Sequence, residues 1–282
     1  MTNCGISYYA ETDEYIEKAK LSARSIKKVH PDLKITLHSD VAVKSEYFDN
    51  IKIISTLDHP FLTRIKCMKN PPYKKTLFLD TDTYICANIM DVFDILGRFD
   101  IALSYASVRA SDYSGFKSSL PPSFPEFNAG VVAMKKTAAT KDLVNLWFQK
   151  YENYVAEDTH DQPFLRQALF ESPSVDICTL PPEYNCRPQF PGYIQGKVRI
   201  LHSHEIEHEQ FCRQLNEFPN RKKVFTGKIH RKIISSPRIN HYPVAKQRYP
   251  GKSRYHTLIS LFIKRVKQVG VVRSIKEALM MN

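Results

Sequence analysis

The chain has 282 residues, of which 43% are hydrophobic and 11% aromatic, so it can bury a substantial core and is not an intrinsically disordered polypeptide. The formal net charge is +12, but residues 219–282 hold 16 Lys/Arg and one acid, which leaves −3 for residues 1–218. The basic character therefore belongs to a C-terminal extension. We divide the chain into one α/β domain, residues 1–218, and a basic, partly helical extension, residues 219–282.

The six cysteines are scattered and form no Cys-x-x-Cys pair. In a chain of this length such spacing favours reduced thiols in an intracellular protein over a disulfide framework or a zinc site. The first 15 residues lack the basic start and apolar core of a secretory signal, and no apolar run reaches membrane-spanning length. We expect a cytoplasmic protein.

The first part of the chain alternates predicted strands with predicted helices. Thr12 or Asp13 is expected to cap the first helix, whose apolar residues recur at helical spacing. Strands are predicted at residues 4–10, 33–37, 51–54 and 76–79, and a short second helix at 61–68. This alternation predicts a parallel sheet wrapped by helices, with ligands at the carboxyl ends of the strands.

The second part continues with less regular spacing. A helical turn is predicted at residues 90–96, strands at 101–104, 131–134, 175–180 and 199–202, and helices at 137–154 and 162–170. The only tryptophan, Trp147, is expected in the core. The polar segment 107–126 is either a lid, an acceptor loop or a disordered surface loop.

The apolar strand at 76–79 ends in Asp80-Thr81-Asp82, and the chain is organised around this stretch. Side chains at spacing i, i+2 point to the same face of a strand. Two unpaired carboxylates there would be costly, and a divalent cation completed by ligand phosphates is the usual remedy. The alternative is that Asp-x-Asp only caps a helix or marks a turn.

His202 ends the last of these predicted strands. A neutral imidazole is a suitable ligand for Mn²⁺ and would complement the two carboxylates, although a lone histidine in such a place is often structural.

Taken in order, several segments resemble family 8 glycosyltransferases of the GT-A fold, the group that includes glycogenin and the galactosyltransferases of bacterial lipopolysaccharide synthesis. The likeness covers about residues 4–204. It rests on Thr12-Asp13-Glu14-Tyr15, Leu62-Thr63-Arg64-Ile65-Lys66-Cys67, Leu77 to Ile89, Phe127-Asn128-Ala129-Gly130-Val131, Asp158-x-x-Asp161-Gln162 and His202.

The resemblance implies a Rossmann-like mixed sheet flanked by helices. It also implies transfer of a hexose from a nucleoside-diphosphate sugar, most often UDP-linked, with retention at the anomeric carbon. The acceptor would be a glycan, a protein or a lipid-linked molecule.

Residue by residue, the resemblance implies that Asp80, Asp82 and His202 hold Mn²⁺ or Mg²⁺. Thr12 and Tyr15 belong to the segment that grips the nucleotide, with Tyr15 stacked on the base, and Arg64 stands near the diphosphate. The sugar pocket would be lined by Asn128, Asp158, Asp161 and Gln162.

One segment departs from the family pattern. The family commonly follows its metal-binding histidine with Gly and a Lys-Pro-Trp run that closes on the diphosphate, whereas here His202 precedes Ser-His-Glu-Ile-Glu-His-Glu. The lysine that would neutralise the leaving phosphate is therefore unassigned, and Lys222 or Lys228 are candidates.

The extension places Leu258, Leu261, Phe262, Val266 and Val269 on one helical stripe. Such a helix would either lie on an anionic membrane, making the protein peripheral on its inner face, or pack on the domain. Nucleic-acid binding is a weaker hypothesis because no recognised motif accompanies the charge.

Two functional alternatives stay open at this point. A haloacid-dehalogenase-type phosphatase also ends a strand in Asp-x-Asp, but there the motif lies near the start of its domain and is normally followed two residues later by Thr or Val, not by Tyr84. A non-catalytic nucleotide-sugar-binding or membrane adaptor is favoured by the missing Lys-Pro-Trp run.

Overall fold

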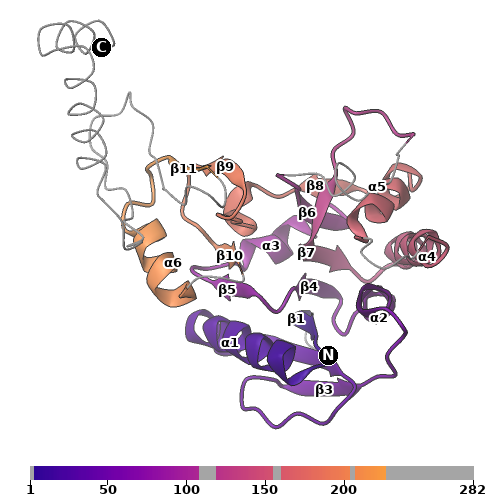
Figure 1. Ribbon diagram of the computed structural model, residues 1–282, viewed down its shortest axis with the longest axis horizontal. Coiled ribbons are helices and arrows are strands. Elements are labelled where there is room, and N and C mark those ends of the chain that lie inside the picture. Colours follow the sequence, from indigo (N-terminus) through magenta and orange to yellow (C-terminus); the bar gives the residue numbers. More distant parts are fainter. Residues whose placement is uncertain (1–2, 108–118, 155–159, 204–206, 227–282) are drawn as a thin grey trace, which may run out of the picture. The chain divides into compact units, whose positions relative to one another are not determined.

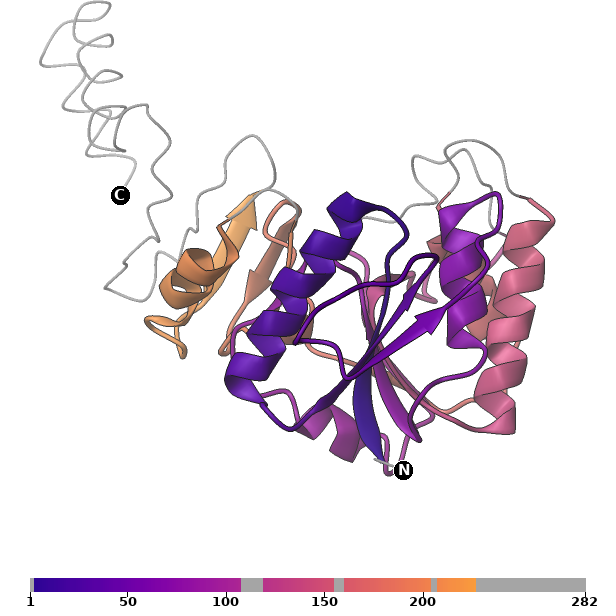
Figure 2. The same ribbon diagram turned by 90° about the horizontal axis from the view of Figure 1, so that it is seen from below.

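The computed structural model describes residues 3–107, 119–154, 160–203 and 207–226 (Figures 1 and 2). A seven-stranded sheet has the order β3-β2-β1-β4-β7-β6-β8. Its strands are β1 (Cys4–Tyr9), β2 (Lys34–Ser39), β3 (Asn50–Ile53), β4 (Lys75–Leu79), β6 (Ile101–Tyr105), β7 (Phe127–Lys135) and β8 (Ile177–Thr179).

The first four strands of this sheet are parallel, as their alternation with helices predicts. Strand β7 is antiparallel to both β4 and β6, so the sheet as a whole is mixed. The expectation of a parallel sheet therefore holds for the N-terminal half. The mixed GT-A sheet implied by the resemblance is confirmed.

Helices cover both faces of the sheet (Figures 1 and 2). They are α1 (Asp13–Val29), α2 (Pro60–Met68), α3 (Asp91–Ile95), α4 (Ala138–Glu152) and α5 (Gln162–Phe170). A further helix, α6 (His208–Asn216), packs elsewhere. One core lies between the sheet and α1 and α3, and a second lies under α2, α4 and α5. Trp147 belongs to the second core and is 1% exposed, which confirms the prediction for it.

Helix α1 has the predicted cap and the predicted stripe. Thr12 is the N-cap, and its side-chain oxygen accepts a hydrogen bond from the backbone N–H of Tyr15. Ile16, Ala19 and Ala23 are buried against the sheet.

Two small sheets and α6 form a third cluster beside the main sheet. Strand β5 (Thr83–Ile85) pairs antiparallel with β10 (Ile200–His202), and β9 (Pro191–Ile194) pairs with β11 (Lys223–Thr226). Of these four short strands the sequence predicts only β10, because three or four residues carry little periodic pattern. Strand β11 lies in the predicted extension, and the division of the chain at 218 stays a prediction.

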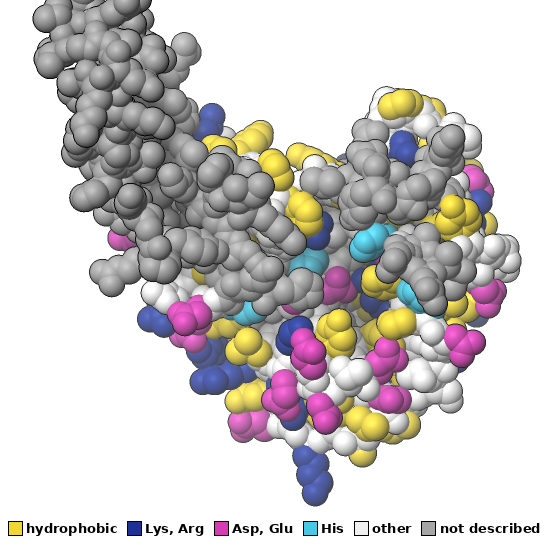
Figure 3. Space-filling view, in the orientation of Figure 1, with side chains coloured by type: hydrophobic (Ala, Val, Ile, Leu, Met, Phe, Trp, Pro, Cys, Tyr) yellow, Lys and Arg dark blue, Asp and Glu magenta, His cyan; other side chains and the backbone are white. Residues whose placement is uncertain are grey.

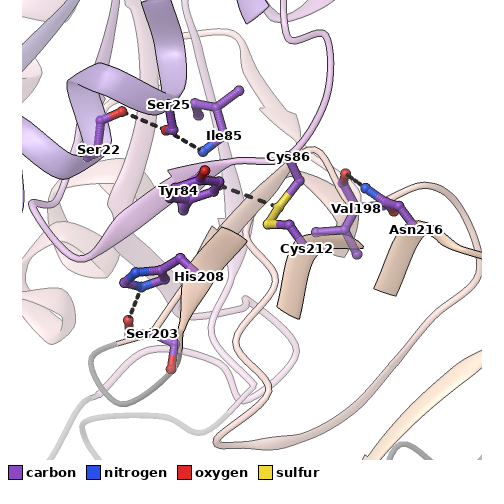
Figure 4. The surroundings of a disulfide bond; sticks show 10 residues. All are labelled: Ser22, Ser25, Tyr84, Ile85, Cys86, Val198, Ser203, His208, Cys212 and Asn216. Carbon is purple, nitrogen blue, oxygen red and sulfur yellow. Dashed lines mark hydrogen bonds between the residues drawn. A yellow bond between two sulfur atoms is a disulfide. The ribbon is translucent and has the colours of Figure 1, made fainter. Parts of the chain in front are cut away.

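The structure corrects one expectation outright, because Cys86 and Cys212 form a disulfide (Figure 4). Cys86 follows β5 and Cys212 lies on α6, and their Cα atoms are 5.4 Å apart, within the usual range for this bond. The remaining four cysteines are free thiols. The expectation of a cytoplasmic protein rested partly on reduced cysteines and loses that support.

Several expectations fall on residues outside the described ranges. These are most of the polar segment 107–126 and the amphipathic stripe at 258–269 with its membrane contact. Within the described residues, none of the helices combines the length and the apolar character needed to cross a membrane.

Candidate metal and nucleotide-sugar site

Two carboxylates and one imidazole converge just beyond the carboxyl end of β4. Asp80 and Asp82 follow that strand, and the pairing of β5 with β10 places His202 opposite Thr83. Nε2 of His202 lies 3.3 Å from Oδ2 of Asp82 and 3.8 Å from Oδ2 of Asp80. One ligand atom from each residue lies within 4.8 Å of the others. We call these three residues the ligand triad.

Oxygen and imidazole nitrogen donors suit Mn²⁺. Asp82 and His202 are both almost fully buried, and Asp80 is about a third exposed, so one side of the ligand triad stays open. Figure 3 shows histidine side chains near the middle of one face of the molecule, where basic and acidic side chains are interspersed. The donors therefore fit a divalent cation that keeps positions for a ligand's phosphates.

Gly130 explains how the triad fits against β7. A Cβ at this position would lie 2.3 Å from Cε1 of His202 and 2.6 Å from Oδ2 of Asp80. The backbone carbonyl of Gly130 also accepts a 2.8 Å hydrogen bond from the N–H of Asp80. Only glycine leaves room for the imidazole and the carboxylate at this point of the sheet.

A directed chain of hydrogen bonds fixes the tautomer of His202. The backbone N–H of Gly130 donates to Oδ1 of Asn128, which makes that atom the acceptor. Nδ2 of Asn185 therefore donates to Oδ1 of Asn128 at 2.8 Å, and Oδ1 of Asn185 accepts from Nδ1 of His202 at 2.8 Å. Nδ1 of His202 is thus the donor, and Nε2 is the ring nitrogen that faces the two carboxylates.

The same chain reaches Gln162 at the start of α5. Nδ2 of Asn128 donates to Oε1 of Gln162 at 2.9 Å. Two residues predicted to line the sugar pocket are therefore in direct contact, and Asn185 connects them to the ligand triad.

Arg64 on α2 connects the ligand triad to Asp161. Its guanidinium donates to Oδ1 of Asp80 at 2.7 Å and to Oδ2 of Asp161 at 2.5 Å. Burial would lower the pKa of Arg64, but the two carboxylates outweigh it and hold this pKa above its ordinary value. The indole N–H of Trp147 donates to the backbone carbonyl of Asp161 at 3.0 Å, which secures the turn before α5.

The remaining predicted site residues are less closely tied to the ligand triad. Thr12 caps α1, and the ring of Tyr15 is 45% exposed on its first turn. Asp158 lies outside the described residues, as does Lys228, and Lys222 is exposed just before β11. The roles of these residues stay predictions.

Asn185 is the residue that sequence analysis misses. It follows a single helical turn, η2 (Pro182–Tyr184), and is buried. A side-chain amide can accept and donate at once, so it can connect an imidazole to a second amide. The sequence offers no signal for this role, because Asn185 and His202 are 17 positions apart.

A cavity of about 350 Å³ lies beside Asn185. Its lining includes Tyr105 at the end of β6 and Tyr193 on β9, whose side chains are 53% and 62% exposed. Phe190 and Arg187 also line it, with the guanidinium of Arg187 4.2 Å from the centre of the Phe190 ring. The cavity is therefore rich in aromatic surface and adjoins the amide chain.

Comparisons with known proteins agree with this fold. Among solved structures, an active-site mutant of LgtC matches with a TM-score of 0.54 and 18% identity, covering 75% of this chain and 94% of LgtC. The glycosyltransferase GlyE of Streptococcus pneumoniae TIGR4 matches with a TM-score of 0.51 and 18% identity, covering 78% of this chain and 57% of GlyE. At this identity the likeness shows the fold alone. A search of curated protein sequences gives no match.

The family comparison goes further than the fold. The model of the nucleotide-diphospho-sugar transferase family matches residues 74–231, more than half of the chain. This segment contains the ligand triad, Asn128, Asp161, Gln162 and Asn185. The chain therefore belongs to the nucleotide-diphospho-sugar transferase family and is a glycosyltransferase with the GT-A fold.

Proposed function

We propose that the protein transfers a hexose from a UDP-linked sugar to a glycan, protein-borne or lipid-linked acceptor, with Mn²⁺ or Mg²⁺ held by Asp80, Asp82 and His202. The observation that carries this proposal is the convergence of three ligand atoms within 4.8 Å at the carboxyl end of β4. The donor and ion are inferred from the family resemblance and the donor chemistry of the triad. The phosphatase hypothesis loses weight because the family match covers the Asp-x-Asp segment.

The residues around the triad suit the charges of sugar transfer. When C1 of the sugar separates from the diphosphate oxygen, negative charge grows on the diphosphate and positive charge on the sugar ring. A bound divalent cation supplies electrostatic stabilisation of the diphosphate. The carboxylate of Asp161 and the side-chain carbonyl of Gln162 supply electron-rich oxygens for the oxocarbenium-like sugar. Arg64 and Asn128 hold these two residues in place.

The aromatic cavity beside Asn185 is the place that we propose for the acceptor. Tyr105 and Tyr193 present exposed rings, which suit the apolar face of a sugar. In a screen of simple sugars, an acceptor that speeds UDP release by the wild type is expected to lose this effect in Tyr193→Ala. A Tyr193→Ala variant that responds to the same acceptor as fully as the wild type would remove the cavity from the proposal.

Slow hydrolysis of the donor tests the proposed reaction without a known acceptor. UDP-glucose and UDP-galactose are incubated with Mn²⁺, UDP release is followed, and proton NMR identifies the first anomer of the freed sugar. We expect release with retained configuration, abolished by EDTA and by Asp82→Asn. The control is Asp142→Asn, which changes an exposed aspartate on α4. Hydrolysis that persists in both EDTA and Asp82→Asn would reject the metal assignment.

A further inference from the structure

With a diphosphate bound, the site would carry more negative charge than Arg64 and a divalent cation balance. Arg64 is shared between Asp80 and Asp161, so it balances one of the site's carboxylates. A divalent cation in the ligand triad would balance two more. A diphosphate brings additional negative charge, and charge-assisted hydrogen bonds from lysine or arginine are the usual response to it.

Helix α1 runs along β5 with a fixed register. Ser22 Oγ lies 2.9 Å from Oγ1 of Thr83, and Ser25 Oγ accepts a 2.8 Å hydrogen bond from the N–H of Ile85. Figure 4 shows Ser22 and Ser25 on the side of α1 that faces this strand. Moving toward the start of α1 therefore means moving along the strand toward Asp82.

Lys18 is one helical turn before Ser22 on that same face of α1. This spacing carries its side chain toward the segment that precedes Thr83, where Asp82 lies. The pKa of Lys18 is raised chiefly by the hydrogen bond that its ammonium donates to Glu14. The negative charge of Asp82 raises it to a smaller extent, in agreement with this placement.

The contacts of Lys18 leave its ammonium free to change partners. Nζ lies 2.5 Å from Oε1 of Glu14, whose side chain is 73% exposed, and 5.0 Å from the centre of the Tyr15 ring. An ion pair with such an exposed carboxylate is worth little in water. The ammonium group is thus near both the tyrosine expected to stack on the base and a carboxylate of the ligand triad.

We propose that Lys18 binds the diphosphate of the nucleotide sugar and supplies the positive charge for which the family resemblance leaves no lysine. This inference rests on the proposed function, because it needs a nucleoside diphosphate between Tyr15 and the triad. Lys18 would exchange Glu14 for a phosphate oxygen when the donor binds.

Two dissociation constants measured by calorimetry test the proposal, one for Mn²⁺ alone and one for UDP at saturating Mn²⁺. In Lys18→Ala we expect UDP to bind about tenfold more weakly. Mn²⁺ alone is expected to bind as tightly as in the wild type or more tightly, because a like charge near Asp82 is removed. Lys18→Arg should restore most of the UDP affinity.

Lys20→Ala is the matched control. Lys20 lies on the same helix and pairs with Glu17 at 2.6 Å, and its exposure of 26% is close to the 30% of Lys18. We expect Lys20→Ala to bind Mn²⁺ and UDP with the dissociation constants of the wild type. Unchanged UDP affinity in Lys18→Ala would overturn the inference, and so would an equal loss of Mn²⁺ and UDP affinity, which would indicate a structural role. A wild type that binds neither UDP nor GDP with Mn²⁺ would overturn the proposed function and this inference together.

Discussion

Oδ1 of Asn185 accepts a 2.8 Å hydrogen bond from Nδ1 of His202, and the other end of the same amide donates to Asn128. One buried side chain thus sets the tautomer of the proposed metal ligand and joins it to the residues proposed to face the sugar. Mutation of groups that orient a metal-binding histidine in this way typically costs about tenfold to a hundredfold in metal affinity.

Replacing Asn185 should therefore weaken metal binding. In Asn185→Ala we expect Mn²⁺ affinity to fall about tenfold to a hundredfold, because the imidazole loses its orientation. Asn185→Asp keeps an acceptor for Nδ1 of His202 and should lose less Mn²⁺ affinity than Asn185→Ala. Calorimetric titration with Mn²⁺ measures both variants, and wild-type affinity in Asn185→Ala would contradict the assigned tautomer chain.

Gly130 should tolerate no side chain. In Gly130→Ala the new Cβ would overlap His202 and Asp80, so we expect lost Mn²⁺ binding and a destabilisation of about 1–3 kcal/mol. Gly192→Ala is the control, since its Cβ would meet only Oγ of Ser107 at 4.0 Å. Chemical unfolding and metal titration of both variants check this, and equal behaviour of the two would show that the space beside the triad is larger than described.

The disulfide between Cys86 and Cys212 should stabilise the fold by restricting the unfolded chain. The two residues are 126 positions apart, and removing such a crosslink commonly costs about 2–4 kcal/mol. We expect Cys86→Ser/Cys212→Ser to unfold earlier in urea under non-reducing conditions, while Cys178→Ser behaves as the wild type. Thiol titration of the denatured, unreduced protein should find the four free cysteines, and six thiols would contradict the crosslink.

The buried imidazole of His38 on β2 should make the folding stability depend on pH. Burial, aided by the charge of Lys52, lowers the pKa of His38 from 6.5 to about 4, so the folded protein keeps this imidazole neutral. The unfolded chain takes up this proton below about pH 6.5 and the folded protein only near pH 4. The stability linked to neutral His38 is therefore full above pH 6.5 and is lost as the pH falls toward 4.

Two measurements check this linkage. An NMR titration of the His38 imidazole should give a midpoint well below that of an exposed histidine. Urea unfolding between pH 7 and 5 should show a weaker pH dependence in His38→Gln than in the wild type. A midpoint near 6.5 would contradict the burial of this group.

The sequence predicts the long, periodic elements well and the short ones poorly. Helix α5 begins at Gln162 and ends at Phe170 as its pattern predicts, because acidic residues precede its start and its apolar residues recur at helical spacing. Strands β5, β9 and β11 are too short to carry a period and depend on pairing with distant partners.

The residues of the candidate site also include some that the sequence predicts and some that it does not. Asp80 and Asp82 end a recognisable strand, and family resemblance connects them to His202, which the structure places beside them. The role of Asn185 and the pairing of Cys86 with Cys212 depend on contacts between distant parts of the chain, which spacing alone does not specify.

The measurement that tests the central claim most directly is the melting temperature with UDP, GDP, UDP-glucose or UDP-galactose, each in Mn²⁺ or in EDTA. A ligand at 100 times its dissociation constant stabilises the native state by about 2.7 kcal/mol, which raises the melting temperature by a few degrees. We predict such a rise for the uridine nucleotides in Mn²⁺, its loss in EDTA and its loss in Asp82→Asn. No rise with any nucleotide, or an equal rise in EDTA, would contradict a metal-dependent nucleotide-sugar site at Asp80, Asp82 and His202.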